Sequence, residues 1–181
     1  MCGIVGAVGT PNAQNIVLNG LQKLEYRGYD SAGIALANSG TLHVFKAVGK
    51  VTNLKDILPS HDSSVTSAVG HTRWATHGAP SENNAHPHVQ GSIAVVHNGI
   101  IENYQSLRND LQAAGITFIS ETDTETIPAL IHRAKTEGKT LREAVQNFVA
   151  QAKGAFAVGV MDTETPNTLI GTRRGAPLCI G

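Results

Sequence analysis

"CGIVGAVG" (residues 2–9) places a cysteine one residue from the start of the chain and follows it with a short apolar run. This run predicts a strand over Gly3–Gly9, with glycines small enough for close packing. Chain ends usually fray, so a strand that holds Cys2 still is unusual. Cys2 is either a small core residue, the commoner role of a free cysteine, or a thiol fixed in place for chemistry.

Composition limits the classes of protein to which the chain can belong. It has 181 residues, 41% of them hydrophobic, which is enough for one domain with a core that needs no disulfides or metals. The 14 basic residues balance the 14 acidic ones without charge blocks, so we expect no nucleic-acid or membrane partner. Two cysteines, the absence of a signal peptide and the lack of any long apolar run predict a cytoplasmic protein.

The first half of the chain predicts helix and hairpin structure. Thr10 and Pro11 predict a helix start with Thr10 as the N-cap, and Gly28 predicts its end. Its apolar stripe comprises Val17, Leu18, Leu21 and Leu24. "AGIALA" (32–37) and "TLHVFKA" (41–47) flank the turn sequence "NSG" and predict a β-hairpin.

Two further strands are predicted at 64–73 and 92–99. The stretch between them, "WATHGAPSENNAHPH" (74–88), predicts a long loop, and long ordered loops tend to be functional. A helix is predicted over 103–114 with Gly115 as its stop. "TDTE" (122–125) and "TLRE" (140–143) match the capping box and each predicts a helix start.

The end of the chain returns to strands, at 155–162, 168–174 and in "PLCIG" (177–181), with a turn over 161–169. The order of elements lacks regular βαβ alternation, which favours an α+β fold with antiparallel sheets. Strands that are apolar on both faces suit a sheet lying between helices and a second sheet. An apolar strand at the end of a chain is unusual, so we expect this sequence to be part of a longer protein.

Removal of Met1 would make Cys2 the N-terminal residue and place an α-amine beside its thiol. The pKa of an α-amine is about 7.7–8.0 and that of a thiol about 8.5. Moving the proton from sulfur to nitrogen therefore costs under about 1 kcal/mol. One residue can then act as both nucleophile and base. With Met1 retained, this nitrogen is an amide and cannot act as a base.

Five sequence blocks together resemble one enzyme family. They are "CGIVG" (2–6), "EYRGYDSAG" (25–33), "HTRWATHG" (71–78), "HNGIIEN" (97–103) and "SETDTE" (120–125). In this order they resemble the class II glutamine amidotransferases, over the whole length of the chain. Tyr26, Tyr29 and Ser31 favour the branch that makes glucosamine 6-phosphate from fructose 6-phosphate. The alternative is another branch, such as the amidophosphoribosyltransferases, whose first motif looks like "HRGQDAAG".

The resemblance implies roles for the residues of these blocks. Cys2 is the nucleophile, and Asn98 and Gly99 form the oxyanion hole, although Asn-Gly is by itself a common hairpin turn. Arg73 grips the α-carboxylate of glutamine through its planar fork, and Asp123 holds the α-ammonium. An acidic residue at position 123 would also favour a helix start.

Other residues are implied to bind or cover the substrate. Thr76 and His77 lie where the family binds glutamine, and Trp74 belongs to a mobile loop over the site, unless it is simply a core anchor. Arg27 and Gly28 are implied to line the pocket near Cys2.

The resemblance also implies an N-terminal-nucleophile fold, an αββα four-layer sandwich with two antiparallel sheets. Residues 1–181 would then be a glutamine amidotransferase domain, truncated at its C-terminal end and lacking the sugar-isomerising domains. It implies glutamine as the substrate of this domain, fructose 6-phosphate as that of the missing domains, no cofactor, and a homo-oligomeric full-length enzyme.

Two alternatives come from other classes. Five histidines at positions 71, 77, 86, 88 and 97 could hold zinc in a metallohydrolase, but HExxH and regular ligand spacing are absent. A catalytically inactive binding domain is the other, and the presence of every block needed for chemistry argues against it.

Overall fold

A computed structural model describes residues 2–38, 40–60, 65–74 and 78–181. Two four-stranded sheets, antiparallel throughout, form its centre. The first sheet has the order β1 (Gly3–Val8), β4 (Ser67–Arg73), β2 (Ser31–Asn38), β3 (Thr41–Val48). The second has the order β5 (His88–Gln90), β6 (Ile93–Gly99), β7 (Phe156–Asp162), β8 (Leu169–Arg174).

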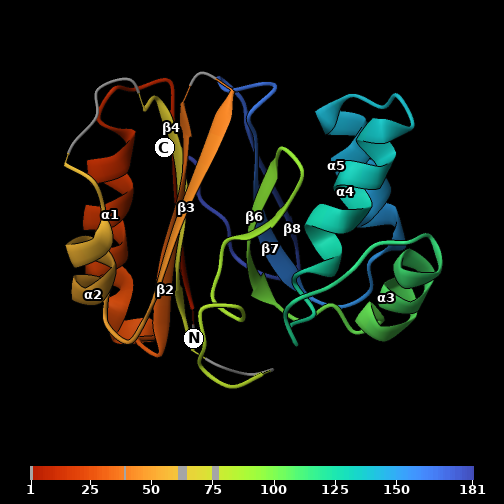
Figure 1. Ribbon diagram of the computed structural model, residues 1–181, viewed down its shortest axis with the longest axis horizontal. Helices are drawn as coiled ribbons and strands as arrows, with labels where there is room; N and C mark the ends of the chain where they lie inside the picture. Colours follow the sequence, from red (N-terminus) through yellow and green to blue (C-terminus); the bar gives the residue numbers. More distant parts are fainter. Residues whose placement is uncertain (1, 39, 61–64, 75–77) are drawn as a thin grey trace.

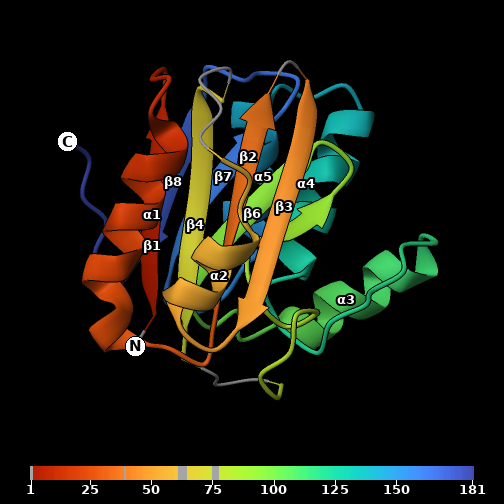
Figure 2. The same cartoon turned by 60° about the vertical axis from the view of Figure 1, so that its left-hand side comes forward.

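Helices cover the outer face of each sheet, as Figure 1 shows. α1 (Ala13–Leu24) and α2 (Val51–Ile57) lie on the first sheet, and α4 (Thr126–Thr136) and α5 (Leu141–Gln151) lie on the second. α3 (Tyr104–Ala113) extends to one side, which is clearest in Figure 2. These layers form the expected αββα four-layer sandwich.

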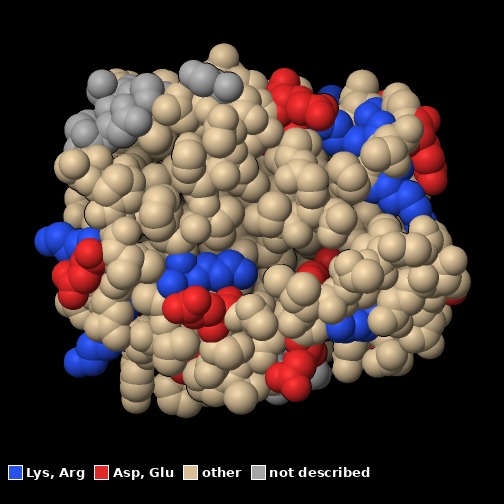
Figure 3. Space-filling view, in the orientation of Figure 1, with Lys and Arg blue, Asp and Glu red and all other residues tan. Residues whose placement is uncertain are grey.

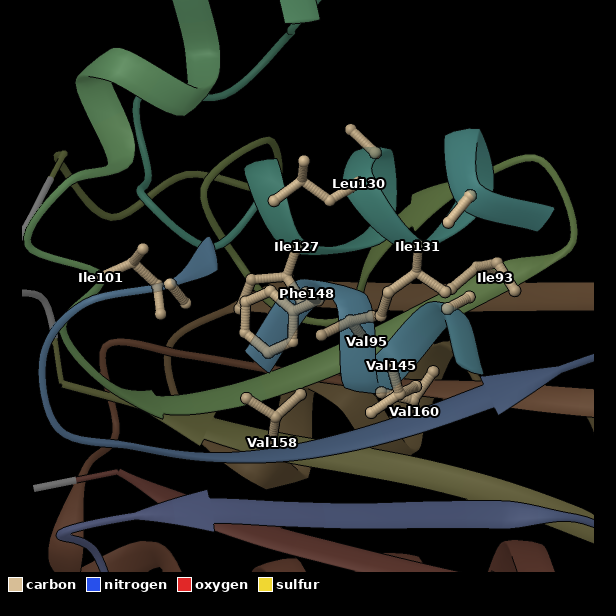
Figure 4. Close-up of a cluster of buried hydrophobic side chains, with 14 of the residues drawn as sticks. Ile93, Val95, Ile101, Ile127, Leu130, Ile131, Val145, Phe148, Val158 and Val160 are labelled. Atoms are coloured by element: carbon tan, nitrogen blue, oxygen red, sulfur yellow. The ribbon is translucent and has the colours of Figure 1, made fainter. Parts of the chain in front are cut away.

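Apolar side chains fill all three spaces between the layers. Val17 and Leu21 of α1 pack on the first sheet, while Val69 and Val96 belong to the cluster between the sheets. The largest cluster lies between the second sheet and its helices, where Phe148 of α5 is fully buried (Figure 4). Strands β2, β6 and β7 are buried on both faces along nearly all of their length, because each sheet is covered on both sides.

Strand β1 holds the start of the chain in place. Gly3 lies opposite Thr72 of β4, and Val8 lies opposite Ser67. The Gly3 N–H also donates to the Thr72 hydroxyl oxygen at 3.2 Å. The predicted strand therefore anchors Cys2 at the end of the first sheet.

The predicted start of the first helix is wrong by two residues, because the N-cap is Asn12 and not Thr10. Thr10 instead begins a turn: its side-chain oxygen accepts from Asn12 N at 3.3 Å, and its carbonyl accepts from Ala13 N at 3.1 Å. α1 then starts at Ala13. It ends at Leu24, and a 3-10 turn (Glu25–Arg27) leads to Gly28, so the predicted glycine stop marks the end of that turn.

Of the two predicted capping boxes, one is confirmed and one is wrong. Thr140 and Glu143 form a capping box at the start of α5. In "TDTE", by contrast, the Glu125 carboxylate accepts from the Ile119 and Ser120 N–H groups at 3.0 and 2.7 Å. Because its carboxylate holds this preceding loop, it does not cap a helix, and α4 begins only at Thr126.

One further prediction is wrong, and one helix was not predicted. The segment 177–181, predicted as a strand, has no regular structure and is mostly exposed, and β8 ends at Arg174. α2 was not predicted; it has seven residues and lacks a side-chain cap, so the sequence carries little signal for it. The hairpin of β2 and β3, the strands β4, β6, β7 and β8, and helix α3 are confirmed.

Charges are scattered over the surface seen in Figure 3, and neither sign gathers into an extended patch on that face. Among the described residues, no helix is long and apolar enough to cross a membrane.

Candidate active site

A cavity of about 430 Å³ opens where β4 and β6 end, at the start of β1. Seven of the residues to which the resemblance assigns a role line it: Cys2, Arg27, Arg73, Trp74, Asn98, Gly99 and Asp123. They come from segments far apart in the chain, and antiparallel pairing of β1 with β4 together with the stacking of the two sheets brings them together.

The Cys2 thiol lies against the main chain of Trp74. The Trp74 N–H donates to Sγ at 3.3 Å, and Sγ lies 3.7 Å from the Trp74 carbonyl oxygen. Burial raises the pKa of the Cys2 thiol, while the Trp74 N–H and the Arg73 charge act in the opposite direction. The raised pKa keeps the thiol protonated at neutral pH, so a nucleophilic role requires a base.

Asn98 lies beside Cys2 at the end of β6. Its Nδ2 donates to the Cys2 carbonyl oxygen at 3.2 Å. Asn98 and Gly99 are paired with Ala157 and Phe156 of β7, so the simple hairpin-turn interpretation of "NG" is wrong. Gly99 has φ +123°, and a Cβ there would lie 2.1 Å from the Ala155 carbonyl oxygen. No other residue fits this backbone.

Two buried groups of opposite charge line the same cavity. The Arg73 guanidinium, at the end of β4, donates to the Gly78 carbonyl at 2.9 Å and to the Ala79 carbonyl at 3.4 Å. The Asp123 carboxylate accepts from Ile101 N at 2.8 Å. Asp123 Oδ1 also lies 3.4 Å from the Thr124 hydroxyl, and both Arg73 and Asp123 are at most 5% exposed. The cavity therefore offers one cation and one anion.

The other predicted residues divide into three groups. Trp74 is 49% exposed with its ring edge-on to Tyr29 at 5.7 Å, so the core-anchor interpretation is wrong. Gly28 does not line the cavity; it is buried against the Arg73–Trp74 main chain, where a Cβ would lie 2.8 Å from the Arg73 carbonyl oxygen. Thr76 and His77 lie outside the described residues.

Four histidines form a buried cluster at one wall of the cavity, and two of them, His86 and His97, line it. The rings of His71 and His86 are 4.0 Å apart, and the Thr124 hydroxyl lies 2.9 Å from His86 Nε2 and 2.8 Å from His97 Nδ1. His88 Nε2 lies 3.0 Å from the Thr122 hydroxyl. Burial lowers the pKa of His71 to about 3 and that of His97 to about 4.

This cluster does not resemble a metal site. Within the described ranges, no group of three or more His, Cys, Asp or Glu side chains is arranged to hold a metal ion. One nitrogen of each ring faces a hydroxyl or carbonyl group instead. The zinc alternative gains no support.

Several cavity residues were not predicted. They include Ile100, Thr122, Thr124, Ala155, Ala157, Ala176 and Pro177. His71, considered only as a zinc ligand, contacts Asn98 directly. Its spacing could have revealed this, because it stands two residues before Arg73 on a strand and therefore on the same face. Nothing in the sequence around Ala155, Ala157 and Ala176 indicates that they line a cavity.

These groups define what the cavity can do chemically. A thiol lies beside an amide that can donate to a developing oxyanion, and a cation and an anion are both available to hold an amino acid. The arrangement suits acyl transfer from the side chain of a free amino acid.

Comparison with known proteins agrees with this chemistry. A family model described as a glutamine amidotransferase domain matches residues 71–178. The chain is 53% identical over 181 residues to the glutamine–fructose-6-phosphate aminotransferase (isomerizing) of Acinetobacter baylyi, and 51% identical over 189 residues to that of Synechocystis. Both alignments cover 100% of this chain, which spans about 30% of the length of these relatives.

A solved structure shows the same fold. The glutamine phosphoribosylpyrophosphate amidotransferase of B. subtilis aligns with 90% of this chain and 35% of its own, at 30% identity and a TM-score of 0.77. The identity to the fructose-6-phosphate enzymes is higher, which favours that branch over the phosphoribosyl branch. With the family model matching more than half of its length, the chain belongs to the glutamine amidotransferase domain family.

Proposed function

We propose that this chain is a glutaminase domain that hydrolyses the side-chain amide of glutamine through Cys2. One observation carries the proposal: the Cys2 thiol, the Asn98 amide, the Arg73 guanidinium and the Asp123 carboxylate all line a single cavity. Arg73 would bind the α-carboxylate of glutamine and Asp123 its α-ammonium. These two contacts place the side-chain amide toward Cys2.

The first half of the reaction forms a thioester. After removal of Met1, the α-amine of Cys2 accepts the thiol proton, and sulfur attacks the amide carbon of the glutamine side chain. The Asn98 side-chain amide and the Gly99 N–H stabilise the tetrahedral oxyanion. Losing one such donor typically costs about 2.7–4 kcal/mol of transition-state stabilisation. The protonated amine donates its proton to the leaving nitrogen, the C–N bond breaks, and ammonia departs.

The second half regenerates the thiol. Water attacks the γ-glutamyl thioester, and the α-amine takes a proton from that water. The C–S bond breaks, the thiolate recovers its proton from the amine, and glutamate is released. Thr76 and His77 are proposed to contact glutamine, Arg27 to line the site, and the exposed Trp74 to cover it.

For the whole protein, we propose glutamine–fructose-6-phosphate aminotransferase activity. The support is 51–53% identity to enzymes of that name along the entire chain. Residues 1–181 would be the glutamine amidotransferase domain, and ammonia would pass to fructose 6-phosphate bound by further domains. Such a domain alone would hydrolyse glutamine without making glucosamine 6-phosphate. A homo-oligomer in the cytoplasm, where reducing conditions keep Cys2 a free thiol, completes the proposal.

Intact mass measurement combined with labelling by a glutamine-like electrophile, such as 6-diazo-5-oxonorleucine, tests the glutaminase. We expect a chain lacking Met1, one label located on Cys2 by peptide mass spectrometry, and ammonia released from glutamine before labelling but not after it. Labelling of Cys179 instead, or unchanged hydrolysis after complete labelling of Cys2, would contradict the assignment. Formation of glucosamine 6-phosphate from glutamine and fructose 6-phosphate tests the whole-protein proposal separately.

A further inference from the structure

His71 lies directly behind Asn98, at the contact between the two sheets. The residue belongs to β4 of the first sheet, whereas Asn98 ends β6 of the second. Its ring is fully buried, and its Nε2 atom lies 3.0 Å from the His97 carbonyl oxygen and 3.0 Å from Asn98 Oδ1. The His71 Nε2 atom thus contacts two groups of β6.

These contacts determine the tautomer of His71. A main-chain carbonyl can only accept a hydrogen bond, so the His71 Nε2 atom must carry a hydrogen to interact with His97 O. Burial also lowers the pKa of this ring to about 3, although its hydrogen bonds to Asn98 and to the His97 carbonyl act in the opposite direction. A neutral ring with hydrogen on Nε2 has none on Nδ1.

The tautomer in turn determines the orientation of the Asn98 amide. With Oδ1 toward His71, Asn98 accepts from the Nε2–H group and its Nδ2 donates to the Cys2 carbonyl oxygen at 3.2 Å. In the flipped orientation the NH₂ group would face another N–H, and Oδ1 would face a carbonyl oxygen. Both contacts would be repulsive, so only the observed orientation is compatible with its surroundings.

Of the two nitrogens of the His71 ring, only Nε2 has hydrogen-bond partners among the described residues. His71 Nδ1 is buried and has no hydrogen-bond partner among the described residues. If position 71 only filled space, an apolar side chain of similar size would serve without burying any nitrogen. His71 thus leaves one polar atom unsatisfied while its other nitrogen holds Asn98.

We propose that His71 is a positioning residue that keeps the Asn98 NH₂ group turned toward Cys2, where the oxyanion forms. An NH₂ group has two hydrogens, so one can bind the Cys2 carbonyl while the other stabilises the oxyanion. This inference rests on the proposed glutaminase function. His71 itself does not touch the substrate; it acts through Asn98.

Two variants separate positioning from packing. His71→Leu keeps the bulk and removes the donor, and His71→Gln restores an N–H donor of similar reach. For His71→Leu we expect kcat for glutamine hydrolysis to fall about tenfold to a hundredfold, with KM changing less than about threefold, because the oxyanion exists only after binding. His71→Gln should recover most of kcat.

Alkylation of Cys2 by iodoacetamide supplies the control readout. This reaction displaces iodide from a saturated carbon and forms no oxyanion. In His71→Leu its rate at Cys2, followed by peptide mass spectrometry to exclude Cys179, should stay within about twofold of the unsubstituted protein. In an Asn98→Ala background, His71→Leu should have little further effect on kcat, because the two residues act as one unit.

Unchanged kcat in His71→Leu would overturn the proposal, and so would a loss of alkylation as large as the loss of kcat. Full additivity with Asn98→Ala would also overturn it. If thermal unfolding shows that His71→Leu does not fold, His71→Asn, whose amide is too short to reach Asn98, is compared with His71→Gln by the same criteria. Failure of the proposed function is distinct: the unsubstituted protein would then alkylate at Cys2 and unfold normally without hydrolysing glutamine.

Discussion

The side-chain amide of Asn98 donates a 3.2 Å hydrogen bond to the main-chain carbonyl of Cys2, although the two residues are 96 positions apart. This contact joins the start of the first sheet to the end of a central strand of the second. It holds the proposed nucleophile and the proposed oxyanion donor on one side of the cavity, so each depends on the position of the other.

Replacing the nucleophile tests the chemistry most directly. Cys2→Ser should reduce glutamine hydrolysis to background, because a hydroxyl is far harder to deprotonate than a thiol. Cys179→Ser is the matched control, since Cys179 is exposed and does not line the cavity. Ammonia release measures both. Substantial activity in Cys2→Ser would remove Cys2 from the mechanism.

The amine of Cys2 can be tested without altering the thiol. An extra Ala between Met1 and Cys2 leaves an amide at the Cys2 nitrogen, whether or not Met1 is cleaved. We expect this variant to bind glutamine but to hydrolyse it at background rate, because an amide cannot accept the thiol proton. Intact mass establishes the N-terminus. An active variant of verified mass would refute the amine as base.

Arg73→Lys keeps the charge and removes the planar fork. The KM for glutamine should rise about tenfold or more, since a bidentate contact to the α-carboxylate becomes a single one. Arg142→Lys, at an exposed position of α5, is the control. Steady-state kinetics together with thermal unfolding distinguish weaker binding from lost folding. An unchanged KM would exclude the carboxylate-binding role.

Thr124 holds two histidines with one hydroxyl. Thr124→Val is isosteric but leaves His86 Nε2 and His97 Nδ1 without this partner, which should cost about 1–3 kcal/mol of unfolding free energy for each unsatisfied buried group. Urea unfolding measures it. Thr52→Val, exposed on α2, should change stability by less than about 0.5 kcal/mol. Equal stability of the two variants would contradict the role of this hydroxyl.

The buried histidines should make the fold sensitive to mild acid. Their pKa values are lowered in the folded state, to about 3 for His71 and about 4 for His97, whereas the unfolded chain protonates near pH 6.5. As pH falls below about 6.5, these histidines bind protons in the unfolded chain but stay neutral in the folded chain. The free energy of unfolding should therefore fall by up to about 1.4 kcal/mol per pH unit for each such histidine.

Urea unfolding between about pH 7.5 and about pH 5 measures this loss, in a range where few carboxylates titrate. Stability that stays constant over this range would show that these rings are not both buried and neutral.

Local patterns in the sequence predicted most of the helices and strands of the fold. Short apolar strands, the "NSG" hairpin and the Thr140–Glu143 capping box depend on neighbouring residues, and the structure has each of them. The errors occur where a side chain predicted to cap a helix binds other main-chain groups instead. Glu125 binds the N–H groups of residues 119 and 120 instead of capping a helix, and Thr10 closes a turn beside Thr66.

The sequence by itself determined the chemical groups of the site: a cysteine one peptide bond from the chain start, an Asn-Gly pair, an arginine and an aspartate, each in a specific motif. Only the tertiary structure decided that His71 faces Asn98, that Gly28 packs behind the site instead of lining it, and that Trp74 is exposed. The physical reason is that the chemical groups a site contains can be read from the residue type at each position. The direction of an amide or a ring, by contrast, is set by hydrogen-bond partners that two stacked sheets bring from opposite ends of the chain.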